Sequence, residues 1–300
     1  MARNATISSI TFISTDDRDD NLKRANELID QAAIDKPDLI VLPEVFRESP
    51  NCLHKPSEVA EAIDGPTVTT IAAKARQHSC YFVCPLVERL NGKCYNAAAL
   101  IDRKGSVVGK YHKYYPTIGE LEAGVAPGES LPVFTTDFGK VGIAICYDLN
   151  FWDVGEGLAK AGAEIIAFPS QYRGGQQFIA WAYRLGCYMV SATPTEHSRI
   201  VDPLGRILAD SSMHAPIITS RLNLDRIVVH IDYNAGGVAE AKKKYGGKLE
   251  VVVASPEGLY MLINHDPKTT IDQIVREFNI EPLPVYYDRA RATRKAALKS

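Results

Sequence analysis

Apolar runs of strand length alternate with helical spacings along most of the chain. Residues 5–14 form a first apolar run, residues 19–33 carry apolar side chains at helical intervals, and residues 38–42 form a second run. These periods are typical of a strand, an amphipathic helix and another strand. The same patterns predict strands at residues 80–87, 95–102, 141–145, 164–168 and 187–192, and helices at residues 68–78, 154–161 and 176–185. The alternation predicts a layered α/β protein.

Turn signals add antiparallel hairpins to these crossovers. Asn91-Gly92 separates residues 82–88 from residues 95–102, and this dipeptide favours the tight turn of a two-residue hairpin. Residues 202–205, Asp-Pro-Leu-Gly, separate two shorter runs in the same way. Hairpins and helical crossovers together predict sheets with both antiparallel and parallel pairs.

No shift in composition marks a domain boundary until near the carboxy-terminal end. We therefore expect one domain over residues 1–265 and an extension over residues 266–300. The extension has a helical pattern at residues 270–278 and a basic helical pattern at residues 287–298. The basic segment is interpreted either as a solvated tail helix or as an arm that packs on a second subunit.

The charge balance excludes several kinds of partner. The chain has 34 lysine and arginine residues against 36 aspartate and glutamate residues, which leaves a formal net charge of −2. That balance offers no basic surface for a phosphate backbone. The amino-terminal residues lack a basic segment leading into an apolar one, and no run approaches the ~18 apolar residues of a membrane span. We expect a cytoplasmic protein without nucleic-acid or membrane partners.

The six cysteines are too scattered for the disulfide framework of a small secreted domain. Cys80 and Cys84 lie close in sequence and are the candidates for a structural zinc site. On one strand, however, their side chains would stand about 13 Å apart, too far for one metal ion. We therefore expect no zinc at this pair.

One cysteine stands at the end of an apolar run. Residues 141–145 lead directly into Cys146, and a helical pattern follows a few residues later. A thiol at such a strand-to-helix turn is exposed at the sheet edge, beside backbone N–H groups that can bind an oxyanion. A buried structural cysteine would give the same local pattern, so other segments must decide.

Two further segments end in groups that a cysteine nucleophile requires. Glu44 follows the apolar run at residues 38–42, and Lys113 precedes a proline-bounded loop. A carboxylate can remove the thiol proton and an ammonium can stabilise an oxyanion. Taken alone, Glu44 could cap a turn and Lys113 could be a surface lysine.

These segments resemble the signature motifs of the carbon-nitrogen hydrolase (nitrilase) superfamily, in the same order. The motifs are Pro43-Glu44, Lys110-Tyr111-His112-Lys113 and Cys146-Tyr147-Asp148. A Pro-Gly pair at residues 127–128 and the segment 162–170 extend the resemblance to about residues 5–235. It implies a four-layer α-β-β-α sandwich whose subunits pair into a longer αββα-αββα stack, as homodimers or larger assemblies.

The resemblance also implies roles for individual residues. Glu44, Lys113 and Cys146 would form a catalytic triad, with a thioester on Cys146 and with Lys113 and the backbone N–H of Tyr147 as oxyanion donors. The thioester mechanism that the resemblance implies requires neither a metal nor an organic cofactor. The family has a second glutamate after the lysine, for which Glu120 and Glu122 are both candidates. Glu120 is favoured by its separation from the cysteine.

The residues after Cys146 favour an amide or carbamoyl substrate over a nitrile. Tyr147-Asp148 resembles the amidase and carbamoyl-amide branches, whereas nitrilases commonly have Trp-Glu there. Asn150 stands where hydrolases of carbamoyl amino acids often carry arginine. Residues 151–153, Phe-Trp-Asp, also depart from the commoner Phe-Pro-Glu. Asn150 is therefore the pocket candidate on this side of the nucleophile.

Arg173 is the candidate cation for an anionic substrate group, because a loop arginine suits a carboxylate. Its alternative is a role in binding loop carbonyl groups. Tyr172 beside it is a candidate pocket residue. Acyl or carbamoyl transfer through the same thioester, nitrile hydrolysis and a non-enzymatic binding role are the competing functions.

Overall fold

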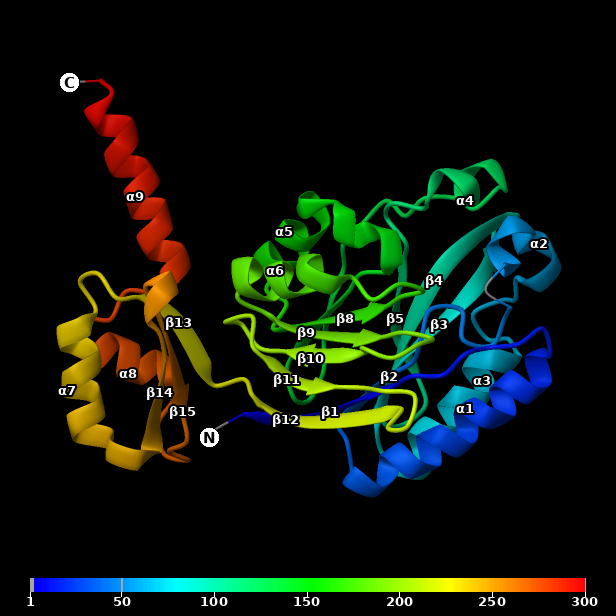
Figure 1. The fold of residues 1–300 in the computed structure, drawn as a ribbon, viewed down its shortest axis with the longest axis horizontal. Coiled ribbons are helices and arrows are strands. Elements are labelled where there is room, and N and C mark those ends of the chain that lie inside the picture. The colour runs from blue at the N-terminus through cyan, green and yellow to red at the C-terminus, as the bar shows by residue number, and fades with distance from the viewer. Residues whose placement is uncertain (1–2, 50, 300) are drawn as a thin grey trace. The chain divides into compact units, whose positions relative to one another are not determined.

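The computed structural model describes residues 3–49 and 51–299, which form two compact units (Figure 1). The larger unit comprises residues 5–222 and the smaller one residues 3–4 and 223–299. No helix within the described residues has the length and apolar character to cross a membrane.

The larger unit contains two sheets of six strands each. The first has the order β12-β1-β2-β3-β4-β5, in which β1, β2 and β3 are parallel and β3, β4 and β5 antiparallel. Its strands are β1 (Asn4–Ile10), β2 (Leu39–Val41), β3 (Tyr81–Leu90), β4 (Lys93–Ile101), β5 (Val107–His112) and β12 (Ile217–Asn223). The β3–β4 hairpin turns at Asn91-Gly92, both with positive φ, as that dipeptide predicts.

The second sheet has the order β11-β10-β9-β8-β7-β6. Its strands are β6 (Val133–Thr135), β7 (Lys140–Ile143), β8 (Ile165–Pro169), β9 (Tyr188–Ala192), β10 (Arg199–Val201) and β11 (Ile207–Asp210). The three central strands β7, β8 and β9 are parallel. Their sequences are nearly continuous apolar runs, as is typical of parallel strands that are buried on both faces.

Helices cover the outer faces of the two sheets (Figure 1). On the first sheet these are α1 (Arg18–Ala32) and α3 (Pro66–His78), and on the second α5 (Trp152–Lys160) and α6 (Gly175–Leu185). The inner faces meet each other, as the hydrogen bond from Ser9 Oγ to the Ser191 carbonyl at 2.6 Å shows. The unit is therefore a four-layer α-β-β-α sandwich, which confirms the expected fold.

Short helical segments complete the larger unit. They are η1 (Ala33–Asp35), η2 (Cys52–His54), α2 (Pro56–Val59), α4 (Ile118–Glu122) and η3 (Cys146–Asn150). The parallel strands β2, β7 and β8 end at one edge, where α4, η3 and the following loops begin. Ligands of α/β folds bind outside this carboxyl edge, because loops from several strands converge there.

The smaller unit has a core of its own. An antiparallel sheet in the order β13-β15-β14 packs its apolar face on the unit's helices. The elements are β13 (Arg226–His230), α7 (Ala235–Tyr245), η4 (Gly246–Lys248), β14 (Leu249–Ala254), η5 (Ser255–Glu257), β15 (Leu259–Asn264), α8 (Ile271–Glu277) and α9 (Leu283–Ala297). The basic helix thus begins at Leu283, earlier than its pattern suggests, and its residues from 287 onward are exposed.

The compact units divide between residues 222 and 223, whereas the sequence predicted a boundary at residue 265. The physical reason lies in the pairing of β13, which joins β15 in a separate sheet rather than extending either sheet of the sandwich. Leu249, Leu262 and Ile274 then share one buried cluster with the β13 side chain Val229.

Candidate active site

Cys146 is the first residue of η3, and the buried residues Ala144 and Ile145 connect it to the end of β7. Its φ is +50°, a left-handed conformation that a non-glycine residue adopts only under local constraint. Such a turn directs the side chain away from the strand and toward the carboxyl edge of the sheet. The structure thus gives Cys146 the elbow geometry that the sequence predicted.

The thiol of Cys146 is protonated at neutral pH. Burial and the negative charge of Glu44 raise its pKa to about 12, although the Lys113 ammonium, the Gln171 N–H and the Ser170 side chain each favour the thiolate. A thiol in this state is a poor nucleophile until a base removes its proton. The chemistry of the site therefore depends on a proton acceptor next to the sulfur.

Glu44 is the carboxylate at this position, and it lies just beyond the end of β2. It is 1% exposed, and three hydrogen bonds hold its carboxylate while a fourth reaches its main-chain carbonyl. Oε1 accepts from Asn96 Nδ2 at 2.8 Å and from Lys113 Nζ at 3.2 Å, and Oε2 accepts from the Gln171 N–H at 2.8 Å. The Gln171 side chain donates to the Glu44 carbonyl at 2.7 Å. Contacts from three other segments therefore fix the orientation of the carboxylate.

Lys113 follows β5 and lies between two carboxylates. Its Nζ is 3.2 Å from Glu44 Oε1 and 2.9 Å from Glu120 Oε2, and its side chain is 1% exposed. Burial alone lowers the pKa of this ammonium, but Glu44, Cys146 and Glu120 together raise it above its ordinary value. Lys113 is therefore a permanently charged buried cation, not a surface lysine.

Glu120 belongs to this cluster, whereas the side chain of Glu122 is exposed. Glu120 contacts Lys113 through both carboxylate oxygens, at 3.0 and 2.9 Å, and its Oε2 accepts from the Thr117 N–H at 2.6 Å. Burial raises the pKa of Glu120, but the Lys113 ammonium holds it below its ordinary value. The same carboxylate completes a capping box with Thr117, so α4 itself positions it.

Asn96 is a site residue that the sequence did not reveal. It lies on β4, and its Nδ2 donates to Glu44 Oε1 and to Glu120 Oε1, both at 2.8 Å. The one available signal was an asparagine within the apolar run of β4, because a buried amide requires partners. Asn96 bridges two acids that share Lys113, so it contributes to the spacing of the cluster.

Asp148 connects the nucleophile turn to β5. It accepts hydrogen bonds from the Ile145 N–H at 2.8 Å, the Tyr111 hydroxyl at 2.7 Å and the Tyr115 N–H at 2.8 Å. Burial raises the pKa of Asp148 to about 6, and these hydrogen bonds only partly oppose it. Asp148 therefore holds the backbone around Cys146 in place without contacting the reacting atoms.

We expect Asp148 to make stability depend on pH. Because its folded-state pKa of about 6 lies above the ordinary 3.8, the stabilisation is present below pH 4 and is lost as pH rises through 6. The stability of the wild type relative to Asp148→Asn should fall by about 3 kcal/mol between pH 4 and pH 7. Urea unfolding of both proteins across this range measures the difference. A difference that stays constant or grows with pH would contradict the assignment.

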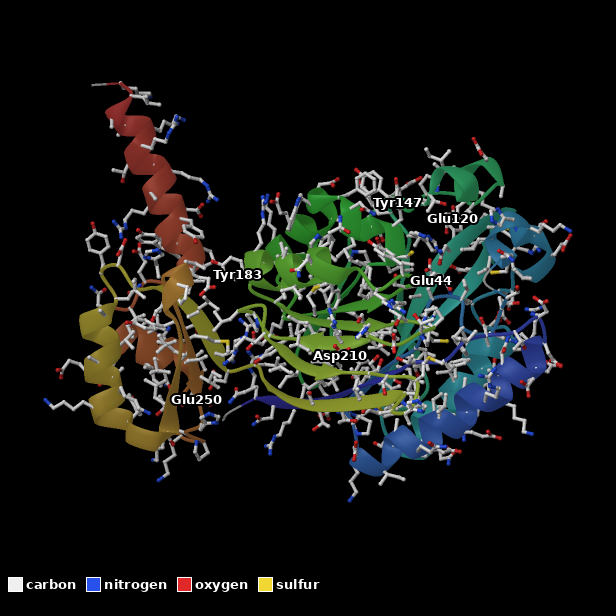
Figure 2. The ribbon with its side chains drawn as sticks, in the orientation of Figure 1. Glu44, Glu120, Tyr147, Tyr183, Asp210 and Glu250 are labelled. Carbon is white, nitrogen blue, oxygen red and sulfur yellow. The ribbon has the colours of Figure 1, made fainter. Side chains whose placement is uncertain are left out.

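Tyr147 follows Cys146 in the first turn of η3, where backbone N–H groups lack intrahelical acceptors. Its ring packs edge-on against Phe151 with centroids 5.3 Å apart. Figure 2 shows Glu44, Glu120 and Tyr147 in the same region of the larger unit, beside α4. The predicted oxyanion donor is thus on the same side of the molecule as the acidic cluster.

Two predicted pocket residues lie next to this turn. Asn150 donates from Nδ2 to the Tyr147 carbonyl at 3.0 Å and accepts at Oδ1 from Gln177 Nε2 at 3.1 Å. Tyr172 lies in the loop after β8, with its ring packed edge-on against Phe168. Asn150 therefore links η3 to α6, and Tyr172 packs on the β8 side chain Phe168.

Arg173 is committed to contacts within its own loops. Its Nε donates to the Glu196 carbonyl at 3.1 Å, and its Nη2 is 3.8 Å from Glu196 Oε1. This is the loop-carbonyl arrangement that the sequence left as the alternative to substrate binding. The guanidinium is half exposed, so the ion pair with Glu196 is weak.

No group of three or more His, Cys, Asp or Glu side chains within residues 3–49 and 51–299 is arranged to hold a metal ion. Cys80 and Cys84 are both fully buried, and burial raises the pKa of each thiol. These two cysteines are therefore part of the apolar core beneath α3.

Comparison with known proteins gives the class of this protein. Residues 4–229 match the family model of the carbon-nitrogen hydrolases. The deaminated glutathione amidase of Homo sapiens is 30% identical over 255 residues, which cover 71% of this chain and 75% of that protein. The omega-amidase NIT2 of Homo sapiens is 26% identical over 237 residues, covering 70% of this chain and 85% of that protein.

Solved structures agree with this result. Saccharomyces cerevisiae Nit3, a member of the nitrilase superfamily, has 25% identity and a TM-score of 0.66, covering 74% of this chain and 90% of its own. An amidase from Nesterenkonia sp. shares the fold with a TM-score of 0.68 at 20% identity, covering 81% and 97%. The chain belongs to the carbon-nitrogen hydrolase family. It is an amidase-like hydrolase of carbon-nitrogen bonds other than peptide bonds.

Proposed function

We propose that this protein hydrolyses small amides through a thioester on Cys146, with Glu44 as base and Lys113 as oxyanion donor. The observation that carries the proposal is the convergence of these groups from the ends of three different strands. A protonated thiol, a fixed carboxylate and a permanent cation are the parts that acyl transfer to cysteine requires.

In the first half-reaction, Glu44 takes the thiol proton while Cys146 Sγ attacks the carbonyl carbon of the amide. The negative charge on the carbonyl oxygen is stabilised by the Lys113 ammonium and the Tyr147 N–H. Glu44 then donates the proton to the leaving nitrogen, the C–N bond breaks, and ammonia or an amine departs. The acyl group remains on Cys146 as a thioester.

In the second half-reaction, Glu44 takes a proton from water, whose oxygen attacks the thioester carbon. The C–S bond breaks, the proton returns to the sulfur, and a carboxylic acid is released. Asn96 and Glu120 contact Glu44 or Lys113 and act as positioning residues in this scheme. The fixed orientation of Glu44 matters because it must move protons in both directions.

The relatives support an amide as substrate, since those compared above are named as an omega-amidase and an amidase. Tyr147-Asp148 after the nucleophile favours the same class over nitriles. Ammonia release from simple amides, carbamoyl compounds and nitriles tests the proposal. Release from amides that Cys146→Ala abolishes is the expected result, and release from nitriles alone would contradict it.

Glu120→Gln tests the assignment of the second glutamate. The amide would keep one acceptor for Lys113 but lose the charge that helps to orient it, so kcat should fall by about 10². Glu122→Gln is the matched control, since its side chain is exposed, and its kcat should stay within about twofold of wild type. Equal losses in both variants would contradict a special role for Glu120.

The assembly and the location form part of the same proposal. We propose pairing of sandwiches into an αββα-αββα stack, for which light scattering should give at least twice the 32.9 kDa of one chain. A monomeric mass would contradict the stack. Residence in the cytoplasm is the remaining part of the proposal, and cell fractionation tests it.

A further inference from the structure

Tyr172 has a fixed position near the nucleophile. Its N–H donates to Ser170 Oγ at 3.0 Å, and Ser170 Oγ donates to the Tyr172 carbonyl at 2.7 Å. The ring packs edge-on against Phe168, with centroids 6.2 Å apart. Hydrogen bonds thus hold the main chain of Tyr172, and Phe168 packs against its ring.

The hydroxyl of Tyr172 is buried, yet none of the described residues accepts its proton. The polar neighbour is Asn150, which lowers the pKa of the phenol and therefore faces it as a donor, while its Oδ1 accepts from Gln177 Nε2. Burial raises the pKa of this phenol, so it remains a donor at all physiological pH values. A buried donor without an acceptor is unfavourable, and a ligand that supplies the acceptor removes that penalty.

The surrounding charges disfavour a carboxylate as that acceptor. Glu44 and Glu120 share the single cation Lys113, which leaves this cluster with a net negative charge. Arg173, the cation next to Tyr172, is bonded to the carbonyl of Glu196 and faces its carboxylate. A further anion would enter a site in which negative charge already prevails.

We propose that the Tyr172 hydroxyl donates a hydrogen bond to a neutral acceptor on the acyl side of the substrate. The preferred substrates are then amides that carry a second neutral carbonyl, such as a diamide, rather than amides with a free carboxylate. The inference rests on the proposed function, because it concerns the acyl pocket of the same Cys146 site.

Three small amides of similar size separate the possibilities. Succinamide carries a terminal carboxamide, succinamate a carboxylate and butyramide a methyl group at the corresponding position. For the wild type, kcat/KM should be about tenfold higher for succinamide than for either of the others, because one hydrogen bond distinguishes them. A preference for succinamate that Arg173→Ala removes would overturn the inference and favour an arginine-bound anion.

Tyr172→Phe removes the donor alone. It should lower kcat/KM for succinamide about tenfold more than for butyramide, and its Tm should equal or exceed that of the wild type, since the lost hydroxyl has no acceptor in the free protein. Tyr287→Phe, at an exposed tyrosine of α9, is the control and should change neither quantity. An equal loss for both amides, or a marked fall in Tm, would overturn the inference.

Glu196→Gln tests the role of the ion pair. Releasing Arg173 from the carboxylate should raise kcat/KM for succinamate several-fold and leave the preference for succinamide over butyramide intact. Calorimetric binding of the three amides to Cys146→Ala separates the two proposals. Succinamide-selective binding without wild-type turnover would sink the hydrolase mechanism alone, whereas turnover without selectivity would sink the Tyr172 assignment alone.

Discussion

Replacing Cys146 with alanine is expected to lower kcat for amide hydrolysis by about 10⁴-fold or more, because the proposed mechanism forms its thioester on this sulfur. The fold should survive, since alanine adopts the positive φ of this position as readily as cysteine does. Ammonia release under saturating substrate measures kcat, and mass spectrometry of the quenched wild-type enzyme detects the acyl adduct on Cys146.

Cys52→Ala is the matched control for this experiment. Cys52 is also buried, and burial together with the nearby Glu48 raises its pKa to about 12, as burial and Glu44 do for Cys146. Cys52 is the first residue of η2, so it does not lie at the strand-end elbow. If Cys52→Ala removed activity while Cys146→Ala retained it, the nucleophile would be wrongly assigned.

Replacing Lys113 with methionine is expected to lower kcat by about 10³-fold and to cost about 3–5 kcal/mol of unfolding free energy. The first effect follows from the loss of the oxyanion donor. The second follows because Glu44 and Glu120 would face each other in a buried site without their shared cation. Steady-state kinetics and urea unfolding at pH 8 measure the two losses.

The pH dependence of Lys113→Met distinguishes this cause from a simple loss of packing. In the wild type, the lowered pKa of Glu120 gives stability that is present above the ordinary value of 4.5 and lost as pH falls. Without Lys113, burial would raise that pKa instead, so the variant should become more stable as pH falls from 8 to 5. A double variant with Glu120→Gln should recover part of the loss at pH 8. A loss independent of pH and of Glu120 would contradict the electrostatic account.

These predictions share one physical basis, which is the balance of charge in a small buried cluster. A protonated thiol, two carboxylates and one ammonium lie where three strands of two sheets end. Changing any one charge alters both the chemistry and the stability, because buried charges are screened little by solvent. The neutral Tyr172 donor is suited to such a site, since it adds recognition without adding charge.

Local sequence determined the elements of the sandwich and the character of its strand ends. The helix at Arg18–Ala32, the Asn91-Gly92 hairpin and the apolar run before Cys146 depend on side chains close together in the chain. Periodicity and turn chemistry therefore predict them. Glu44, Lys113 and Cys146 stand out in sequence for the same reason, because each follows an apolar strand pattern.

Only the tertiary structure decided which polar groups meet. Asn96 on β4 joins Glu44, which follows β2, to Glu120 of α4, and no local pattern predicts that these three segments meet. The choice of Glu120 over Glu122 depends on which side of α4 faces Lys113. Likewise, Glu196 binds Arg173 from a loop after β9, so the sequence could not settle the partner of this cation.

The division into two units was also a tertiary outcome. The apolar runs of β14 and β15 have the length of ordinary strands, and their composition does not differ from that of the sandwich. They form a separate sheet because β13 pairs with β15 and buries Val229 against the helices of its own unit. Sequence thus determined where strands and reactive groups occur, while the pairing of distant segments decided the contacts, because hydrogen bonds and burial depend on proximity in space.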